Sequence, residues 1–440
     1  MLLSFSVRNF RSFRDEQTLS MTRSRRIAAH NANSGPDVNP VTGVYGGNAS
    51  GKSNLLLALR FMGSALRDSH AKWGPDSGVP FDPFRLAGDS ERSTSRFEVD
   101  VSVKGVRYQY GFELTAEEIR QEWLYAYPHG RQQTWFERDS TSAEQWHFGK
   151  NMTGKNRVIS ELTRPNSLFL STAAASKHDQ ISALYSWFSN DLRFADHGNF
   201  NSRLQVTLNE IKAQQASADQ LKRLLKVADL GICDMKVINE DAGARRKMLT
   251  ILQSAMADVD QTEGLNQALD ILAERSRTRI ELQHSSSTGQ GAVSLPFDTE
   301  SMGTRSLIAL GGPVLQALRL GHTLLVDEID TSLHPSLVAE LVRLFKSPTT
   351  NPGHAQLIFT SHDTALLGNL LGNEPVLDRD QTWFVEKDQA GASALYPLTD
   401  FHPRKQENLE RGYLQGRYGA LPFVNMQKLV PQSRNPSGDT

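Results

Sequence analysis

The chain has 440 residues, of which 38% are hydrophobic and 22% are charged. This composition is typical of a globular protein, and the length exceeds what one hydrophobic core usually organises, so we expect more than one domain. The formal net charge of -1 provides no overall basic field for nucleic acid. The single cysteine, Cys233, excludes an intramolecular disulfide and a cysteine-based metal cluster, and we expect it to be a small buried side chain.

No apolar run reaches the roughly 18–20 residues that a membrane-spanning helix needs. Residues 1–10 are too short and too polar for a signal peptide. We therefore expect a cytoplasmic protein with no membrane partner.

The N-terminal residues predict a strand, because Leu3, Phe5 and Val7 alternate with polar residues. Residues 22–40 contain a glycine, two prolines and several arginines, and they predict a loop. For these arginines, a solvated loop is favoured over a contact with DNA.

The stretch from Gly46 to Ser53 has the spacing of a phosphate-binding loop: a glycine, four residues, then glycine, lysine and serine. Residues 41–45 predict a short buried strand, and apolar residues at helical spacing follow from Leu55 to Leu66. A strand, a loop and a helix in this order direct the positive end of the helix at an anion. The sequence therefore predicts a phosphate site rather than a glycine-rich turn that happens to contain a lysine.

Each residue type in this loop has a physical task. Gly46 and Gly51 allow the backbone to close around a phosphate with several N–H groups pointing inward. Lys52 reaches the β- and γ-phosphate oxygens, and the hydroxyl of Ser53 can ligate Mg²⁺.

The middle of the chain changes from strand-like to helical patterning. Between residues 96 and 146, apolar and aromatic residues alternate with polar ones, which predicts antiparallel strands. Core packing explains these aromatic residues better than a binding face does. Residues 167–232 are predicted to be helical and 200–275 to form a helical insertion, and we expect two further strands at 278–282 and 293–297.

Polar residues follow two predicted buried strands. Asp327 and Glu328 end the strand at 323–326, and His362 ends the strand that begins at Gln356. Ligands of parallel sheets bind at the carboxyl ends of the strands. We expect Asp327 to hold Mg²⁺, Glu328 to orient and deprotonate the attacking water, and His362 to donate a hydrogen bond to the γ-phosphate. Isolated residues of these types are more often surface or structural groups, and the phosphate loop is what favours the functional interpretation.

Upstream of the acidic pair, residues 300–304 precede an apolar run that starts at Leu307. Ser301 and the Gly303 amide could lie at a helix N-terminus and bind phosphate, although on their own they form only a capping motif. The Gly-Gly-Pro sequence at 311–313 predicts that the following helix breaks or kinks.

These features and their order resemble the ATP-binding-cassette (ABC) ATPases of the SMC and RecF type. Residues 9–12 resemble the first strand and turn of those proteins, 47–54 their phosphate loop, and 301–304 their signature motif. Residues 330–335 resemble a dimer-contact loop of related prokaryotic families. In that family ATP lies between the phosphate loop of one subunit and the signature of the other, so the resemblance implies a homodimer or higher oligomer.

The resemblance also implies roles for individual residues, with ATP and Mg²⁺ as cofactors. Asp327 would be the metal ligand, with Ser53, and Glu328 the catalytic base, while His362 would be the switch histidine. For Arg11, a contact with nucleotide and a structural salt bridge are equal alternatives. The expected nucleotide-binding residues are Arg11, Gly46, Gly47, Asn48, Ala49, Ser50, Gly51, Lys52, Ser53, Asn54, Ser301, Gly303 and Thr304.

More narrowly, the chain resembles the prokaryotic stand-alone ATPases grouped with the overcoming-lysogenisation-defect and abortive-infection proteins. Residues 383–387 and 407–420 look typical of ATPases encoded beside a nuclease-like or other effector in phage-defence operons. This resemblance extends from residue 1 to about residue 426. It implies an effector partner encoded in the same operon and a phage protein as the trigger.

Some features depart from the family pattern. The glutamine expected between phosphate loop and signature has no clear counterpart, and Gln180 is only a candidate. Met302 replaces a second glycine in the signature, and long coiled-coil arms are absent, so chromosome tethering is not expected. Asp378 and Asp380 mimic a metal-binding pair, but a turn between strands explains them better.

The predicted fold is α/β: a P-loop NTPase of ABC ATPase type with a mixed central sheet, an antiparallel β subdomain and a helical insertion. The expected segments are 1–198 and 277–426 for the two parts of the ATPase domain, 199–276 for the helical insertion, and 427–440 for a disordered tail.

Three functions compete for this fold. The first is a Mg²⁺-dependent ATPase that acts as a sensor or scaffold and controls a partner effector in phage defence. The second is a RecF-like ATPase that binds DNA directly in repair, which the near-neutral charge disfavours. The third is a P-loop kinase or GTPase, against which the signature-like segment, His362 and the absence of a guanine-recognition motif all argue.

Overall fold

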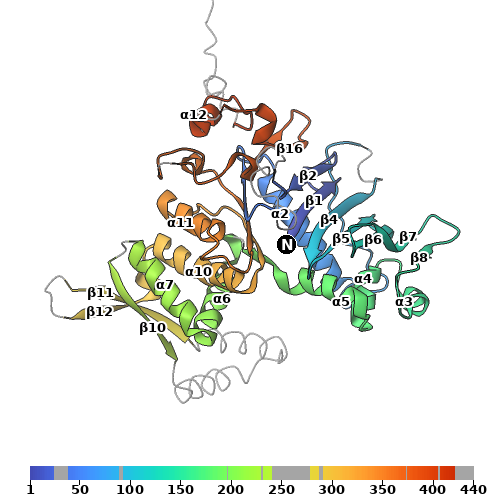
Figure 1. Cartoon of the computed structure of the whole chain (residues 1–440), viewed down its shortest axis with the longest axis horizontal. Coiled ribbons are helices and arrows are strands. Elements are labelled where there is room, and N and C mark those ends of the chain that lie inside the picture. The colour runs from blue at the N-terminus through green and yellow to red at the C-terminus, as the bar shows by residue number, and fades with distance from the viewer. Residues whose placement is uncertain are drawn as a thin grey trace, which may run out of the picture. The chain divides into compact units, whose positions relative to one another are not determined.

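The computed structural model describes residues 1–23, 38–88, 93–195, 197–228, 231–239, 278–286, 291–372, 374–404 and 407–421, and Figure 1 labels its helices and strands. The chain divides into two compact units. The first unit consists of Asn190–Ile358 with Met1, and the second of Leu2–Ser189 with Phe359–Thr440. The expected tail at 427–440 and residues 240–276 of the expected helical insertion lie outside the described residues. The division into segments 1–198, 199–276 and 277–426 remains a prediction.

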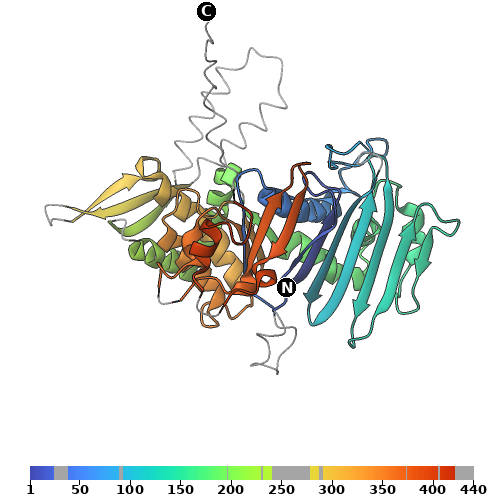
Figure 2. The ribbon, with the colours of Figure 1, turned by 90° about the horizontal axis from the view of Figure 1, so that it is seen from above.

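An antiparallel sheet of seven strands forms much of the second unit, and Figure 2 shows it as a row of blue to teal arrows. Its strand order is β2-β1-β4-β5-β6-β7-β8, so the antiparallel strands predicted between 96 and 146 are confirmed. The strands are β1 (Leu2–Arg8), β2 (Gln17–Ser20), β4 (Ser95–Val103), β5 (Val106–Leu114), β6 (Ile119–Tyr127), β7 (Gln133–Asp139) and β8 (Trp146–Phe148).

One face of this sheet packs into the core. In β4 every second residue is buried, as the alternation in the sequence predicts. The Phe97 ring centroid lies 5.4 Å from those of both Phe10 and Phe112. Phe61, from helix α2 (Lys52–Asp68), lies 5.0 Å from Phe97. The aromatic side chains are therefore core residues, and they fix the helix that follows the phosphate loop against the sheet.

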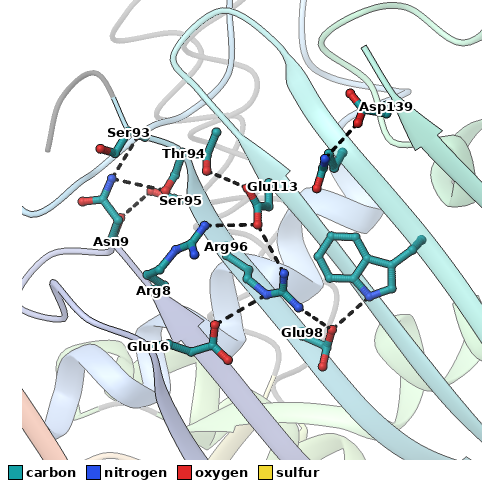
Figure 3. Close-up of polar contacts among 12 residues, drawn as sticks. Arg8, Asn9, Glu16, Ser93, Thr94, Ser95, Arg96, Glu98, Glu113 and Asp139 are labelled. Atoms are coloured by element: carbon teal, nitrogen blue, oxygen red, sulfur yellow. Dashed lines mark hydrogen bonds and ion pairs between the residues drawn. The ribbon is translucent and has the colours of Figure 1, made fainter. Parts of the chain in front are cut away.

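The opposite face of the sheet is polar, and Figure 3 shows its side chains pairing across strands. The Arg96 guanidinium lies 3.0 Å from Glu98, 3.3 Å from Glu113 and 4.5 Å from the Trp123 ring centroid. Arg8 adds a second ion pair to Glu113 at 3.1 Å. Because these groups are partly exposed, each ion pair contributes less than about 1 kcal/mol, but the ion pairs among β1, β4 and β5 together favour a single register.

The phosphate loop follows a strand that is buried along its whole length, β3 (Val41–Tyr45). That strand pairs in parallel with β15 (Thr382–Lys387), which pairs antiparallel with β16 (Ser393–Pro397), so the expected mixed sheet is confirmed. Strand β14 (Gln356–Thr360) passes from the first unit into the second, where Ser361 N donates to the Val44 carbonyl at 3.2 Å. The other α-helices that the structure describes in the second unit are α3 (Asn156–Leu162), α4 (Phe169–Ala175), α5 (Asp179–Ser186) and α12 (Leu409–Leu414). A π-helix (Trp187–Asp191) leads from this unit into the first.

In the part of the first unit that the structure describes, two small sets of strands combine with four α-helices. Strand β13 (Thr323–Val326) pairs in parallel with β9 (Leu192–Ala195). Strands β10 (Ile232–Asn239), β11 (Thr278–Ser285) and β12 (Ala292–Pro296) form an antiparallel sheet, which confirms the strands predicted near 278 and 293. The helices are α6 (Phe200–Ala213), α7 (Gln215–Val227), α10 (Met302–Leu320) and α11 (Pro335–Lys346), and Figure 1 shows α6 and α7 lying beside α10.

The Gly-Gly-Pro sequence at 311–313 predicts a break or a kink. The break is wrong, because α10 continues from Met302 to Leu320 with Pro313 inside it, and the kink stays a prediction. Proline has no N–H, so the Ala309 carbonyl loses its partner in the helix. The hydroxyl of Thr207 in α6 lies 3.1 Å from that carbonyl oxygen. A side chain from a neighbouring helix thus replaces the missing donor.

Within the described ranges, no helix is both long enough and apolar enough to cross a membrane.

His322 immediately precedes β13 and is a buried neutral group. Burial, together with the nearby guanidinium groups of Arg193 and Arg319, lowers the pKa of His322 from 6.5 to about 4. The unfolded chain therefore takes up a proton as pH falls below about 6.5, while the folded chain resists it until about 4. The stability that this histidine contributes is present above pH 6.5 and is lost as the pH falls towards 4.

We expect the free energy of unfolding to fall by about 2 kcal/mol between pH 7.5 and pH 5 through this residue alone. His322→Gln should remove that part of the pH dependence, as measured by urea denaturation at both pH values. The exposed His147 offers a control, and His147→Gln should retain the wild-type dependence. Equal pH dependence in wild type and His322→Gln would contradict the assignment.

Candidate functional site

The loop from Gly46 to Ser53 connects β3 to α2 with a backbone that only glycine permits at two places. A Cβ on Gly46 would lie 2.3 Å from the Val385 carbonyl oxygen. Gly51 caps α2 with a φ of +113°, and a Cβ there would lie 2.3 Å from Ser393 Oγ. The chain therefore passes close to neighbouring groups at both ends of the loop, and it leaves the first N–H groups of α2 available to an anion.

Lys52 is the first residue of α2, and its side chain is only 5% exposed. Its ammonium donates to the carbonyl oxygens of Gly46 at 2.9 Å and Gly47 at 3.1 Å, so the side chain lies along the inside of the loop. A buried cation is stable only when polar groups or an anion surround it. A glycine cradle, a helix N-terminus and this ammonium together fit a phosphate group.

Two segments that are distant in sequence support the loop. Ser393, in β16, donates from its hydroxyl to the Ser50 carbonyl at 2.5 Å and from its N–H to the Ser12 carbonyl at 2.7 Å. Asn54 donates to Ser12 Oγ at 2.8 Å. Ser12 belongs to residues 9–12, which resemble the first strand and turn of the SMC and RecF type ATPases. Ser393, by contrast, lies in no motif that the sequence shows. Of the other predicted loop residues, Asn48 and Ala49 are exposed at the tip and Ser50 is buried.

Arg11 forms a structural salt bridge, which is one of the two alternatives that the sequence leaves open for it. Its Nε donates to Asp82 Oδ2 at 2.8 Å, and its backbone N–H donates to the Asp82 carbonyl at 2.9 Å. Arg11 has a positive φ of 51°, which turns the chain sharply after β1. A contact between Arg11 and nucleotide stays a prediction.

His362 follows β14 and is exposed. The next residue, Asp363, donates from its N–H to Ser361 Oγ at 2.9 Å and accepts from Ala365 N at 2.9 Å, so it caps a short 3₁₀ helix. In that helix, Thr364 donates to Glu410 of α12 at 3.3 Å. The C-terminal segment 407–420 thus contacts the turn that follows His362.

In the first unit, the acidic pair follows the buried strand β13 as predicted. Asp327 N donates to the Ala195 carbonyl of β9 at 3.2 Å. Glu328 has a φ of 51°, and Thr331 donates to its carbonyl from the N–H at 3.0 Å and to its Oε2 from the hydroxyl at 3.2 Å. This left-handed backbone conformation turns the chain sharply after β13.

The predicted signature residues form the start of helix α10. Ser301 is the N-cap, and its Oγ accepts from Thr304 N at 3.1 Å. A Cβ on Gly303 would lie 2.9 Å from the Ser332 carbonyl oxygen, so the turn after the acidic pair packs against this helix end. Glu300, just before the motif, pairs with His284 of β11 at 2.7 Å. Within the first unit the structure thus brings the signature-like motif beside the turn that follows Glu328.

Other candidates from the sequence have structural contacts. Gln180 accepts from Thr153 N at 2.8 Å and donates to the Asn151 carbonyl at 3.1 Å, so it holds a loop. Asp378 caps a 3₁₀ turn before β15, and Asp380 is buried within that turn, as the turn interpretation expects.

The predicted site residues fall in both units of the chain. Lys52, Arg11 and His362 belong to the second unit, and the acidic pair and signature-like motif to the first. Their meeting in one pocket remains a prediction. Among the described residues, no three His, Cys, Asp or Glu side chains gather as a metal site.

A protein-family model described as "AAA domain, putative AbiEii toxin, Type IV TA system" matches residues 41–368, from β3 to the turn after His362. The chain belongs to this family. The predicted place among ATPases of the abortive-infection type is thereby confirmed. A search of curated proteins finds no match.

Three solved structures are similar in fold. The SMC head domain from Thermotoga maritima is 13% identical with a TM-score of 0.40, over 90% of this chain and 98% of that one. An SMC head bound to the C-winged helix domain of ScpA is 12% identical with a TM-score of 0.45, over 94% and 99%. An SMC head with an extended coiled coil, bound to the C-terminal domain of ScpA derived from Pyrococcus furiosus, is 12% identical with a TM-score of 0.36, over 94% and 98%. At these scores the likeness supports no conclusion about function.

The geometry of Gly51 yields a testable expectation. Gly51→Ala strains the backbone and places a methyl group against Ser393 and Ser12, so we expect it to weaken ATP binding at least tenfold and to lower the melting temperature. Gly105→Ala is the matched control, because φ there is +79° but nothing lies within 4 Å of the added Cβ. Calorimetric titration should show wild-type affinity for the control. Equal ATP affinities for the two variants would refute the cradle.

Proposed function

We propose that the chain binds ATP with Mg²⁺ and hydrolyses it, and that its nucleotide state controls a partner effector in phage defence. The observation that supports nucleotide binding most directly is the buried Lys52 ammonium, which lies inside a glycine loop at the N-terminus of α2. That arrangement is selective for a chain of phosphates, because it combines backbone donors, a helix dipole and one fixed cation.

The other residues have complementary tasks in this proposal. Ser53 and Asp327 would hold Mg²⁺, which binds nucleotides through one or two protein ligands together with phosphate oxygens. Glu328 would orient and deprotonate the attacking water, and His362 would donate a hydrogen bond to the γ-phosphate. Ser301, with the Gly303 amide and Thr304, would contact the nucleotide from a second copy of the chain, so the active state would be a homodimer or a larger oligomer.

The family description supports the biological part of the proposal, because it refers to a toxin of a type IV toxin–antitoxin system. A toxin–antitoxin setting involves a second protein, and we propose that the nucleotide state of the ATPase is coupled to the activity of that protein. Loss of a γ-phosphate is a common physical switch for such control, since it removes contacts that order a dimer. We propose a cytoplasmic setting, an effector from the same operon and a phage protein as the trigger.

Substitution of Lys52 by alanine tests nucleotide binding. Lys52→Ala removes the cation inside the loop, so we expect ATP affinity to fall at least a hundredfold in a titration with a fluorescent ATP analogue. Exposed Lys72, in the turn after α2, provides a control, and Lys72→Ala should bind like wild type. ATP affinity that Lys52→Ala leaves intact would remove the phosphate-loop assignment.

Substitution of Glu328 by glutamine tests the chemical step. Glutamine cannot accept the proton of the attacking water, so we expect steady-state hydrolysis to fall by about 10²–10⁴-fold while ATP affinity is kept. The trapped ATP should shift the protein towards dimer or larger species in light scattering. Glu340→Gln, on α11, is a control that should hydrolyse ATP normally.

The same variant separates phage-defence control from DNA repair. If Glu328→Gln with ATP binds duplex DNA tightly without any partner, and this affinity falls steeply with salt, the repair function replaces the one proposed here.

A further inference from the structure

Helix α6 is attached to α10, the helix that starts at the signature-like motif, by a buried hydroxyl. Thr207 in α6 is fully buried, and its Oγ1 lies 2.9 Å from the Ile308 carbonyl oxygen and 3.1 Å from that of Ala309. The same oxygen accepts from Gly312 N at 3.1 Å. One side chain of α6 therefore enters the backbone hydrogen-bond pattern of α10.

The composition of α10 makes this insertion necessary. Pro313 provides no N–H to the Ala309 carbonyl, so that acceptor is left without its helical donor. The Thr207 hydroxyl has one hydrogen, which it can donate to the Ile308 and Ala309 carbonyls of α10 or, at 3.2 Å, to the Arg203 carbonyl of its own helix, while it accepts from Gly312 N. An apolar side chain at 207 would leave the buried Ala309 carbonyl without a donor and would remove the hydroxyl that accepts from Gly312 N, which is destabilising.

The two glycines provide the space for this contact. A Cβ on Gly312 would lie 2.2 Å from Thr207 Cα, so no larger residue fits there without moving α6. A Cβ on Gly311 would lie 2.5 Å from Leu221 Cδ1 of α7. The Gly-Gly-Pro sequence is therefore the place where α6 and α7 pack closely against a continuous helix.

Contacts on either side of the Gly-Gly-Pro sequence also attach α6 to α10. Near the signature-like motif, the Arg305 guanidinium lies 5.4 Å from the ring centroids of both Phe200, the first residue of α6, and Phe297. Near the other end, Arg319 makes two hydrogen bonds of 2.9 Å with the buried carboxylate of Glu210.

We propose that Thr207 is a positioning residue: it clamps the α6–α7 pair to α10 and so fixes where Ser301 is presented. Within the proposed function, Ser301 contacts the nucleotide of a second subunit, so a clamp on α10 affects the step that depends on the dimer. The clamp does not affect ATP binding by the phosphate loop. A displacement of α6 and α7 would then be passed to the signature-like motif through three contacts, namely Phe200–Arg305, Thr207–Gly312 and Glu210–Arg319. This part of the inference rests on the proposed function, whereas the clamp itself does not.

Three variants of the full-length protein test the clamp. Thr207→Val keeps the shape but removes the hydroxyl, and Thr207→Ser keeps the hydroxyl. The control is Thr172→Val, because Thr172 is equally buried and its hydroxyl bonds to the Leu168 carbonyl of its own helix segment. Each variant is measured by amide hydrogen exchange of α10, by ATP affinity and by steady-state ATP hydrolysis.

In Thr207→Val we expect amide exchange at Gly312 and its helical neighbours to rise at least tenfold, and kcat to fall about tenfold. ATP affinity should stay within twofold of wild type, because the phosphate loop is unchanged. Thr207→Ser and Thr172→Val should match wild type in exchange across α10 and in kcat.

If amide exchange across α10 in Thr207→Val equals that of wild type, the clamp is overturned. Raised exchange with an unchanged kcat would overturn the positioning role. If the wild-type protein does not hydrolyse ATP at all, the proposed function fails and the exchange data still decide the clamp. Should Thr207→Val not fold, Phe200→Leu loosens the other attachment near Ser301, and it should lower kcat without changing ATP affinity; an unchanged kcat would contradict the proposal.

Discussion

The buried ammonium of Lys52 is the constraint on which the second unit depends. It lies among the carbonyl groups of its own loop, and such a cation is stable only where the backbone is held tightly curved around it. Gly46 and Gly51 permit that curvature, and Ser393 hydrogen-bonds the loop from β16. The seven-stranded sheet also helps to hold the loop, because its aromatic core residues pack against α2, the helix that follows the loop.

A similar device appears in the first unit, around the signature-like motif. There the critical helix contains a proline and two glycines, which on their own would weaken it. The hydroxyl of Thr207 replaces the missing backbone donor, much as the hydroxyl of Ser393 holds the Ser50 carbonyl in the second unit. In both places a small hydroxylated residue from a distant segment completes the hydrogen bonding of a backbone that serves the predicted site. Short side chains suit this task because they reach the backbone with few rotatable bonds.

Much of the fold was predictable because it depends on local periodicity. Alternation with a period of two predicted the strands between 96 and 146, and the loop between a buried strand and a helix predicted the phosphate site. Of the break or kink predicted at Gly311-Gly312-Pro313, the break is wrong. Thr207 of α6 donates to the Ala309 carbonyl, which Pro313 leaves without a donor, and α10 continues through the proline. For Arg11 the sequence left two interpretations, and the choice of the salt bridge needed the position of Asp82, which is 71 residues away.

By itself, the sequence determined many of the elements, although β9 lies in a stretch predicted to be helical. It also determined the pattern of the phosphate loop, because the spacing of glycine, lysine and serine within eight residues is fixed by the covalent chain. It also determined that Asp327, Glu328 and His362 end buried strands, since apolar runs followed by polar residues are local patterns. Only the tertiary structure decided what holds these groups in place. Ser393 meets Ser50 across 343 positions, and Thr207 meets Ile308 across 101. Such contacts form when the chain packs into a dense interior that leaves buried polar groups few partners, and no local pattern encodes them.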